Sequence, residues 1–210
     1  MAKQRELRVT RQRERGTRAA SGPVSAELIE REAIRLFGER TYPVVGMRDI
    51  SDAVGILPGS LYVHINSKED LLIKIVERGI RSYLDAIAPI AESEQSATIR
   101  LRKAIKAHML VLATALEQTR VSFHQWTYLS SEHKERVILM RQRYEELFSR
   151  ILNDGISSGE FRDLSNPRIA VLALIGMLNS ATEWYSPTGP LSPEALSEVL
   201  ADNALIGLQK

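Results

Sequence analysis

Residues 47–72 read MRDISDAVGILPGSLYVHINSKEDLL, and this stretch decides how the rest of the chain is interpreted. Ile50 and Val54 lie four residues apart and therefore share one face of a short helix, which Gly55 is expected to end. Pro58 suits the first turn of a second helix because it has no amide hydrogen to leave unpaired. Two short helices that meet at a tight corner are typical of a helix-turn-helix, whose second helix enters a groove of DNA.

The second helix, expected over residues 58–64, has two different sides. Leu61 and Ile65 can turn inward, whereas the other side carries small and hydrogen-bonding residues that suit base edges and phosphates. The predicted DNA contacts in this region are Arg48, Pro58, Gly59, Ser60, Tyr62, His64 and Lys68. The alternative is that Tyr62 and His64 pack beneath the helix that follows.

The charge of the chain is unevenly distributed. Residues 1–22 hold seven basic and two acidic side chains, a net charge of +5, which leaves −3 for the remainder because the whole chain carries +2. A basic arm beside a helix-turn-helix favours contact with DNA phosphates, and Arg13, Arg15 and Arg18 are the predicted contacts. The alternative is a solvated tail that only aids solubility.

Composition excludes several classes of protein. The chain has 210 residues and no cysteine, so disulfides and thiolate chemistry are excluded. No apolar run reaches the length that spans a bilayer, and charges occupy the N-terminus where a signal peptide would be apolar, so we expect a cytoplasmic protein without membrane contact. No HExxH motif, phosphate loop or nucleophile elbow occurs, so we expect no enzyme, metal or cofactor.

Helical spacing and caps recur along the whole chain, and no strand pattern appears. Ser67 with Asp70 resembles a capping box that opens a long helix, which Pro89 is expected to stop. The expected helices cover about 26–37, 47–54, 58–64, 68–87, 96–118, 120–129, 131–158, 167–184 and 193–208. The prediction is an all-α chain with a basic arm over 1–22, a DNA-binding domain over 23–70, and a ligand-binding and dimerisation domain over 71–210.

The stretch 47–72 resembles the helix-turn-helix of the tetracycline-repressor (TetR) family of bacterial transcriptional regulators. The residues that carry the resemblance are Arg48-Asp49-Ile50, Ala53-Val54-Gly55-Ile56, Gly59-Ser60-Leu61-Tyr62, His64 and Ser67-Lys68-Glu69-Asp70-Leu71-Leu72. The resemblance implies about nine helices and a homodimer on a palindromic operator, with half-sites about one DNA turn apart or slightly more. It also implies that tilting of the long helix over 68–87 moves the DNA-reading helix.

Two positions depart from the family pattern. Gly46 stands where the family usually has threonine, and Leu57 stands where it favours serine or threonine, so two polar contacts are missing. These departures keep open a second reading, in which the chain is a helical ligand-binding or scaffold protein without specific DNA binding.

The resemblance further implies that the last two helices form a four-helix bundle with those of a second subunit. The segment 169–178 is apolar nearly all round and needs cover on both sides. The predicted dimer contacts are Val171, Leu172, Ile175, Leu178, Leu196, Val199, Leu200 and Leu208. The alternative is a helix buried within its own subunit.

A cavity lined by aromatic residues and a few polar groups would suit a small-molecule effector. The candidate ligand residues are His108, Met109, Phe123, His124, Trp126, Tyr128, Tyr144, Met177, Asn179 and Trp184. Most aromatic residues at helical spacing are ordinary core, and that alternative applies to each of them. An efflux or detoxification regulator that responds to a hydrophobic xenobiotic is the other functional reading.

The segment 183–193, EWYSPTGPLSP, resembles the W-Y-x-P-x-G-P-L-S/T segment of actinobacterial family members that control fatty-acid and steroid breakdown. Those members release DNA on binding an acyl-CoA thioester. The resemblance implies that Arg141, Arg143 or Arg150 meets the CoA phosphates, because guanidinium groups match phosphate geometry. The alternative is that all three are solvated surface charges.

Overall fold

The computed structural model describes residues 25–209, and these residues form helices joined by short loops. The helices are α2 (Ala26–Arg40), α3 (Met47–Val54), α4 (Pro58–Leu61), α5 (Lys68–Ala91), α6 (Ala97–Thr114), α7 (Leu116–His124), the 3-10 helix η1 (Trp126–Tyr128), α8 (Ser131–Ser157), α9 (Pro167–Asn179), α10 (Ala181–Trp184) and α11 (Pro193–Ile206). With the four-residue α10 counted as an extension of α9, residues 25–209 contain nine α-helices, which confirms the all-α prediction.

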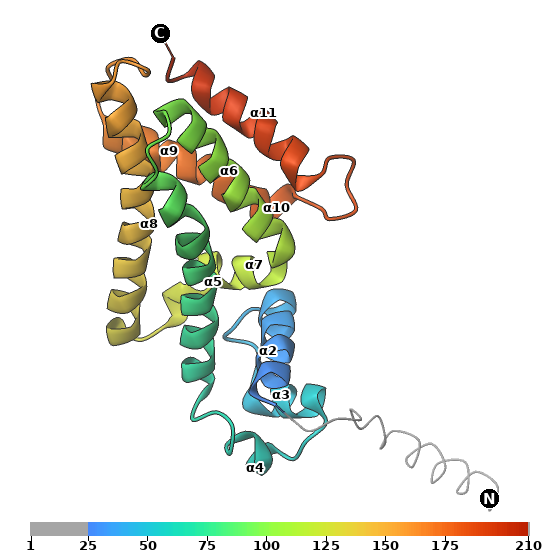
Figure 1. Cartoon of the computed structure of the whole chain (residues 1–210). Helices are drawn as coiled ribbons and strands as arrows, with labels where there is room; N and C mark the ends of the chain where they lie inside the picture. The colour runs from blue at the N-terminus through green and yellow to red at the C-terminus, as the bar shows by residue number, and fades with distance from the viewer. Residues whose placement is uncertain (1–24, 210) are drawn as a thin grey trace, which may run out of the picture.

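The molecule is elongated, with a small helical head at one end and a larger body at the other (Figure 1). The head consists of α2, α3 and α4, and α4 lies at its tip (Figure 1). Helix α5 leaves the head, runs into the body and packs against α6, α7 and α8. Any movement of α5 therefore involves both ends of the molecule.

Four predicted helix starts are confirmed by side-chain caps. The helix expected over 120–129 is wrong, because α7 spans Leu116–His124 and a separate 3-10 turn covers Trp126–Tyr128. Ser25 accepts a hydrogen bond from Leu28 N at 3.2 Å, and Ser67 accepts one from Asp70 N at 2.9 Å. Asn166 and Ser192 cap α9 and α11 in the same way. These bonds satisfy amide groups that the first turn of a helix leaves unpaired.

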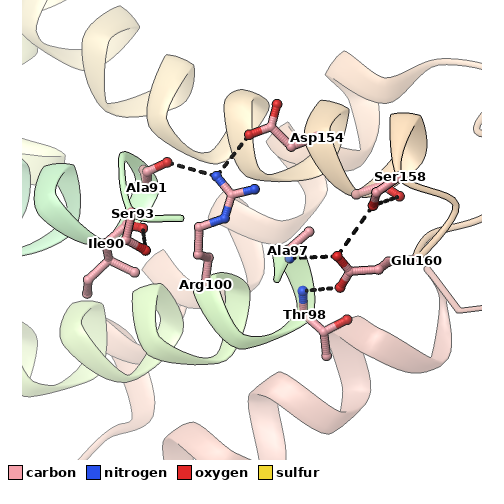
Figure 2. A network of polar contacts seen from close by, with 10 residues as sticks. Ile90, Ala91, Ser93, Ala97, Thr98, Arg100, Asp154, Ser158 and Glu160 are labelled. Atoms are coloured by element: carbon pink, nitrogen blue, oxygen red, sulfur yellow. Dashed lines mark hydrogen bonds and ion pairs between the residues drawn. The ribbon is translucent and has the colours of Figure 1, made fainter. Parts of the chain in front are cut away.

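The prediction that Pro89 stops the long helix is wrong, because α5 continues to Ala91. Pro89 and Asp85 are exposed, so the Asp85 carbonyl that loses its helical partner can face water. Arg100 holds the end of the helix: its Nη1 donates to Ala91 O at 3.0 Å and to Asp154 Oδ2 at 2.9 Å (Figure 2). Glu160 accepts the first amides of α6 nearby, from Ala97 at 3.0 Å and Thr98 at 2.9 Å.

The single helix expected over 96–118 is also wrong, because the chain turns at Ala115 between α6 and α7. Ala115 has φ −136° and ψ 48°, outside the helical region, although alanine is a strong helix former. The turn lets α7 cross the base of the body and pack against α2 and α5. Tertiary packing therefore overrides local propensity here. Helix α4 also ends early, at Leu61, and the residues to 64 form turns.

Two hydrophobic clusters fill the described part of the chain. One lies in the body and joins α5, α6, α8, α9 and α11. The other fills the head but also includes Val121, Leu129 and Val137 from the body. This second cluster packs the head and the body against each other through α5 and α7. The domain boundary at residue 70, which falls inside α5, stays a prediction.

Candidate nucleic-acid interface and ligand cavity

The corner between α3 and α4 has the geometry of a helix-turn-helix. Gly55 adopts φ 82°, a left-handed conformation that suits glycine, and the Gly55 and Ile56 amides both donate to Ser51 O. Ile50 and Leu61 are fully buried and hold the two helices together. The turn at Gly55 and the inward position of Leu61 are confirmed.

The other side of α4 faces outward. The side chains of Arg48, Pro58, Ser60, Tyr62 and His64 are exposed, and Tyr62 is 56% exposed. A side chain added at Gly59 would meet no atom of residues 25–209 within 4 Å. The alternative that Tyr62 and His64 pack beneath α5 is therefore wrong. Contact of these residues with DNA stays a prediction.

Lys68 has an internal role that the sequence did not reveal. Its ammonium donates to Tyr42 O at 3.0 Å and Val45 O at 2.8 Å, and it lies 4.2 Å from the centroid of the Tyr42 ring. Partial burial lowers the pKa of Lys68. The residue thus ties the loop before α3 to the first turn of α5, which leaves one of three N–H groups for a phosphate. The predicted contacts Arg13, Arg15 and Arg18 lie outside the described residues.

A cavity of about 90 Å³ lies between α5, α7, α8 and α9. Its wall combines aromatic, aliphatic and polar side chains. The lining residues are Ile80, Tyr83, Phe123, Arg141, Tyr144, Glu145, Leu172, Ile175 and Asn179. The cavity is thus bounded by the helix that also carries the head.

Polar groups around the cavity are held in fixed positions. Tyr144 OH lies 2.7 Å from His108 Nδ1, and Tyr83 OH lies 3.0 Å from Thr119 Oγ1. Burial lowers the pKa of His108 to about 3 and raises the pKa of both tyrosines, so these groups are neutral at pH 7. Asn179 Oδ1 is buried and has no hydrogen-bond partner among residues 25–209. An unpaired buried acceptor costs free energy, and a ligand with a donor group would remove that cost.

Only Phe123, Tyr144 and Asn179 of the ten predicted ligand residues line this cavity. His108 and Met109 are core residues behind it. Trp126 packs against the cluster that fills the head, and Tyr128 stacks on Tyr42. The cavity residues that the sequence did not single out, such as Ile80 and Tyr83, belong to the apolar stripe of a long helix and carry no separate signal.

The other predicted ligand residues lie in separate places. Trp184 borders an open groove of about 740 Å³ between α2, the start of α7 and the segment 183–187. His124 lies beside that segment, with Nε2 at 3.1 Å from both Thr182 Oγ1 and Glu183 Oε1. Met177 lines a third hollow, near α11. The prediction that all ten residues form one site is therefore wrong.

Of the three arginines considered for phosphate binding, only Arg141 lines the cavity. It is half-buried, its pKa is lowered by burial, and its guanidinium carbon lies 5.3 Å from the centroid of the Trp126 ring. Arg143 and Arg150 are exposed, and Arg150 borders a polar groove near the end of α5. A cation beside an apolar cavity suits a ligand that has both an apolar part and an anionic part.

Two sets of polar contacts connect the head and the first turn of α5 to the body. Gln125, buried at the end of α7, donates from Nε2 to Phe37 O at 2.7 Å and accepts from Tyr42 N at 2.6 Å. Glu69 on α5 accepts from Ser130 N at 2.7 Å and lies 2.8 Å from His133 Nδ1. Gln125 thus joins the end of α7 to α2 and the loop after it, and Glu69 joins the first turn of α5 to the start of α8.

The predicted dimer residues divide into two groups. Val171, Leu178, Leu196, Leu200 and Leu208 belong to the core of the subunit, so the prediction that they form an intersubunit surface is wrong. They pack inward because a helix that is apolar all round buries one side in its own subunit. Leu172 and Val199 are exposed and Ile175 is partly exposed. Ile169 and Ile206, which the sequence did not single out, are 58% and 77% exposed.

Within residues 25–209, no cluster of three metal-ligating His, Asp or Glu side chains occurs. None of the described helices has both the length and the apolar character required to cross a membrane.

Comparisons with known proteins agree with this geometry. The family model described as "Bacterial regulatory proteins, tetR family" matches residues 29–75. The model described as "Tetracyclin repressor-like, C-terminal domain" matches residues 94–208, more than half of the chain. The two matches cover the helix-turn-helix and almost all of the body.

Individual relatives extend the likeness along the chain. The transcriptional repressor KstR2 of Rhodococcus jostii is 29% identical over 185 residues, which cover 84% of this chain and 87% of KstR2. The crystal structure of the regulator PfmR from Thermus thermophilus has a TM-score of 0.79 at 28% identity and covers 87% of this chain and 99% of PfmR. AibR, solved in complex with isovaleryl coenzyme A and operator DNA, has a TM-score of 0.77 at 21% identity over 85% of this chain and 96% of AibR. The chain belongs to the tetR family of bacterial regulatory proteins.

Proposed function

We propose that this regulator is a cytoplasmic, homodimeric repressor that binds a palindromic operator and is released by an acyl-CoA thioester. As a member of a family of regulators, the chain is not an enzyme. The observation that carries the proposal is that α5 joins the two sites. It starts at Lys68, a few residues after α4 in the chain, and its residues Ile80 and Tyr83 line the cavity in the body.

The exposed side of α4 supports DNA binding. Small residues at Gly59 and Ser60 allow close approach to base edges, while Tyr62, His64 and Arg48 can donate to phosphate oxygens. In this arrangement the α4 helices of two subunits occupy successive major grooves, about one DNA turn apart or slightly more.

Exposed apolar side chains on α9 and α11 support a homodimer. Ile169 and Leu172 on α9 and Val199 on α11 are 58%, 43% and 50% exposed. A second copy of the same two helices would cover them in a self-complementary contact. Such a contact also sets the separation of the two α4 helices, and hence the operator spacing.

The wall of the cavity supports an acyl thioester as the effector. An acyl chain suits Phe123, Leu172 and Ile175, while Arg141 suits a CoA phosphate and Asn179 suits a donor group. The solved complex of AibR contains isovaleryl coenzyme A, which shows that this fold accommodates such a ligand in a relative. The segment 183–193 points to the same class of ligand.

The small size of the cavity suggests how the signal is transmitted. Ligand sites commonly enclose about 300–1,000 Å³, so an acyl group must widen a cavity of about 90 Å³. Widening pushes α5 away from α8 and α9, and this movement of α5 moves the head. The distance between the α4 helices of the two subunits then changes. The coupling is reciprocal, so DNA-bound dimer holds the effector less tightly than free dimer does.

The experiment is a titration of operator binding by fluorescence anisotropy. Short-chain and long-chain acyl-CoAs, free CoA and the free acids are added in turn to the full-length protein on its operator. We expect release by at least one acyl-CoA and none by the free acids. Release by an uncharged hydrophobic compound instead would favour the xenobiotic-responsive reading, and no specific operator would favour the scaffold reading.

A matched pair of variants tests the cavity. Arg141→Gln removes the cavity cation, whereas Arg143→Gln removes an exposed cation two residues away on the same helix. Loss of a charge-assisted contact weakens binding by about tenfold or more. We expect the acyl-CoA response to shift by that factor in Arg141→Gln and to stay unchanged in Arg143→Gln. Equal acyl-CoA responses in the two variants would contradict the proposal that the effector binds in this cavity.

A further inference from the structure

Three exposed side chains form a row along the outer side of α4. Ser60 N donates to Leu57 O at 2.9 Å, and Val63 N donates to Ser60 O at 3.3 Å. Hydrogen bonds between residues three apart give about three residues per turn, so side chains at that spacing lie nearly above one another. Leu57, Ser60 and Val63 therefore share one side of the helix and its following turn.

The two apolar members of this row are among the most exposed in residues 25–209. Leu57 is 76% exposed and Val63 is 81% exposed. Their exposure is not a packing defect, because Leu61 of the same segment is fully buried and completes the core of the head. The space beside the row is open at Gly59. Two large exposed apolar groups thus flank α4, the helix that lies at the tip of the molecule (Figure 1).

The chemistry of the DNA major groove offers one apolar group, the C5-methyl of thymine. We propose that Leu57 and Val63 read thymine methyl groups, with the Ser60 hydroxyl between them bonded to a base edge. The inference rests on the proposed function, since it requires α4 to enter the groove. In this proposal, Leu57 does not make the polar contact of the serine or threonine usual at this position. It makes an apolar contact with a thymine methyl instead, and that contact also selects sequence.

The surroundings of the row favour DNA over an apolar protein partner. Tyr62 and His64 are exposed and flank Val63 in the chain, and Arg48 is exposed on α3 of the same head. All three offer hydrogen-bond donors. A dry protein interface would leave these donors unpaired, whereas phosphates on both sides of a groove would satisfy them. The pattern of an apolar centre with polar flanks therefore matches a methyl-bearing groove.

The test replaces thymine by uracil, which lacks only the C5-methyl group. The operator is first selected from random duplexes by the full-length protein, and each thymine of one half-site is then changed singly to uracil. A buried methyl group contributes about as much as a CH₂, so each methyl that is read should be worth about fourfold in affinity. We expect such a loss at one or two thymines of the half-site.

Variants assign each methyl to its side chain. In Leu57→Ala or Val63→Ala, uracil at the corresponding thymine should cost nothing further. Leu139→Ala is the matched control, because Leu139 on α8 is 65% exposed and lies outside the head. It should retain the full uracil penalty. Two outcomes would overturn the reading of methyl groups but not the proposed function. One is specific binding that no uracil substitution weakens, and the other is a uracil penalty that stays unchanged in both Leu57→Ala and Val63→Ala. Failure to select any sequence would overturn both.

Discussion

Phe123 and Gln125 lie two residues apart at the end of α7 and serve different parts of the molecule. Phe123 lines the cavity, whereas Gln125 bonds Phe37 O and Tyr42 N in the head. A ligand that displaces the Phe123 ring would therefore shift the backbone at the end of α7. The same backbone carries Gln125, whose side chain bonds the head. This short connection complements the longer one through α5.

Replacing Gln125 tests that connection. Gln125→Ala leaves the partly buried Tyr42 amide without its partner, whereas Phe37 O keeps its bond from Thr41 N. The free energy of unfolding should therefore fall by about 1–3 kcal/mol. Effector binding should remain, while the effector concentration needed to release operator should change. Thermal unfolding, ligand titration and operator anisotropy measure the three quantities. Gln142→Ala, at an exposed position of α8, is the control; equal behaviour of the two variants would exclude the connection.

A second prediction concerns the packing of α5 against α7, which approach each other closely at Gly79. A Cβ at Gly79 would overlap the Ser122 side chain. Gly79→Ala should therefore destabilise the protein by about 1–3 kcal/mol through overpacking, although alanine favours a helix over glycine by about 1 kcal/mol. The double variant Gly79→Ala, Ser122→Gly should recover most of the loss. A stabilised single variant, measured by urea unfolding, would show that the helices are not in contact.

The contact of Glu69 with the start of α8 predicts a pH dependence. The Ser130 backbone N–H, then the Ser130 side chain and His133, lower the pKa of Glu69 to about 2. A lowered pKa in the folded state stabilises the protein above the unfolded value of about 4.3, and this stabilisation is lost as pH falls toward about 2.

Glu69→Gln should therefore reduce the fall in stability between pH 4.5 and pH 2, an effect on the order of 1 kcal/mol because the side chain is partly exposed to solvent. Urea midpoints across this range provide the measurement. Glu135→Gln, at an exposed position of α8, should match the wild type at every pH. Identical pH profiles for all three proteins would contradict the role of Glu69.

The exposed apolar side of α9 and α11 predicts a dimer that a single charge can break. Val199→Asp should give a monomer at micromolar concentration in analytical ultracentrifugation, because a carboxylate buried between two subunits has no partner. Leu139→Asp places the same group on a similarly exposed position of α8 and should remain dimeric. If Val199→Asp remains dimeric, Val199 does not lie in the subunit interface.

The sequence contained most of the information on the fold because helix ends depend on local chemistry. Ser25, Ser67, Asn166 and Ser192 each cap the helix that their side chain predicts. The turn at Ala115 is poorly marked in the sequence, since no glycine or proline stands there. Thr114 is the one residue beside it with a capping side chain, and its hydroxyl bonds Leu110 O instead of capping α7. Packing of α7 against α2 and α5 determines that turn, and such packing joins segments far apart in the chain.

The two sites differ in how far they could be predicted. The exposed side of α4 follows from a local sequence pattern, so the inward position of Leu61 and the outward position of Tyr62 were both expected. The cavity depends on how four helices meet, and a periodic apolar stripe does not reveal that Tyr83 faces it. The stripe of α9 likewise hides which side is core, so Val171 and Leu178 were assigned to the wrong surface. Lys68 was expected to face DNA, but its carbonyl partners come from a loop distant in sequence.

The most direct test of the account is a footprint of the full-length protein on DNA selected from random duplexes. We expect protection of two inverted half-sites about one DNA turn apart or slightly more. We expect Tyr62→Ala, which removes a side chain that is 56% exposed just after α4, to lose that protection. Protection that is independent of sequence, or a footprint unchanged in Tyr62→Ala, would contradict the account.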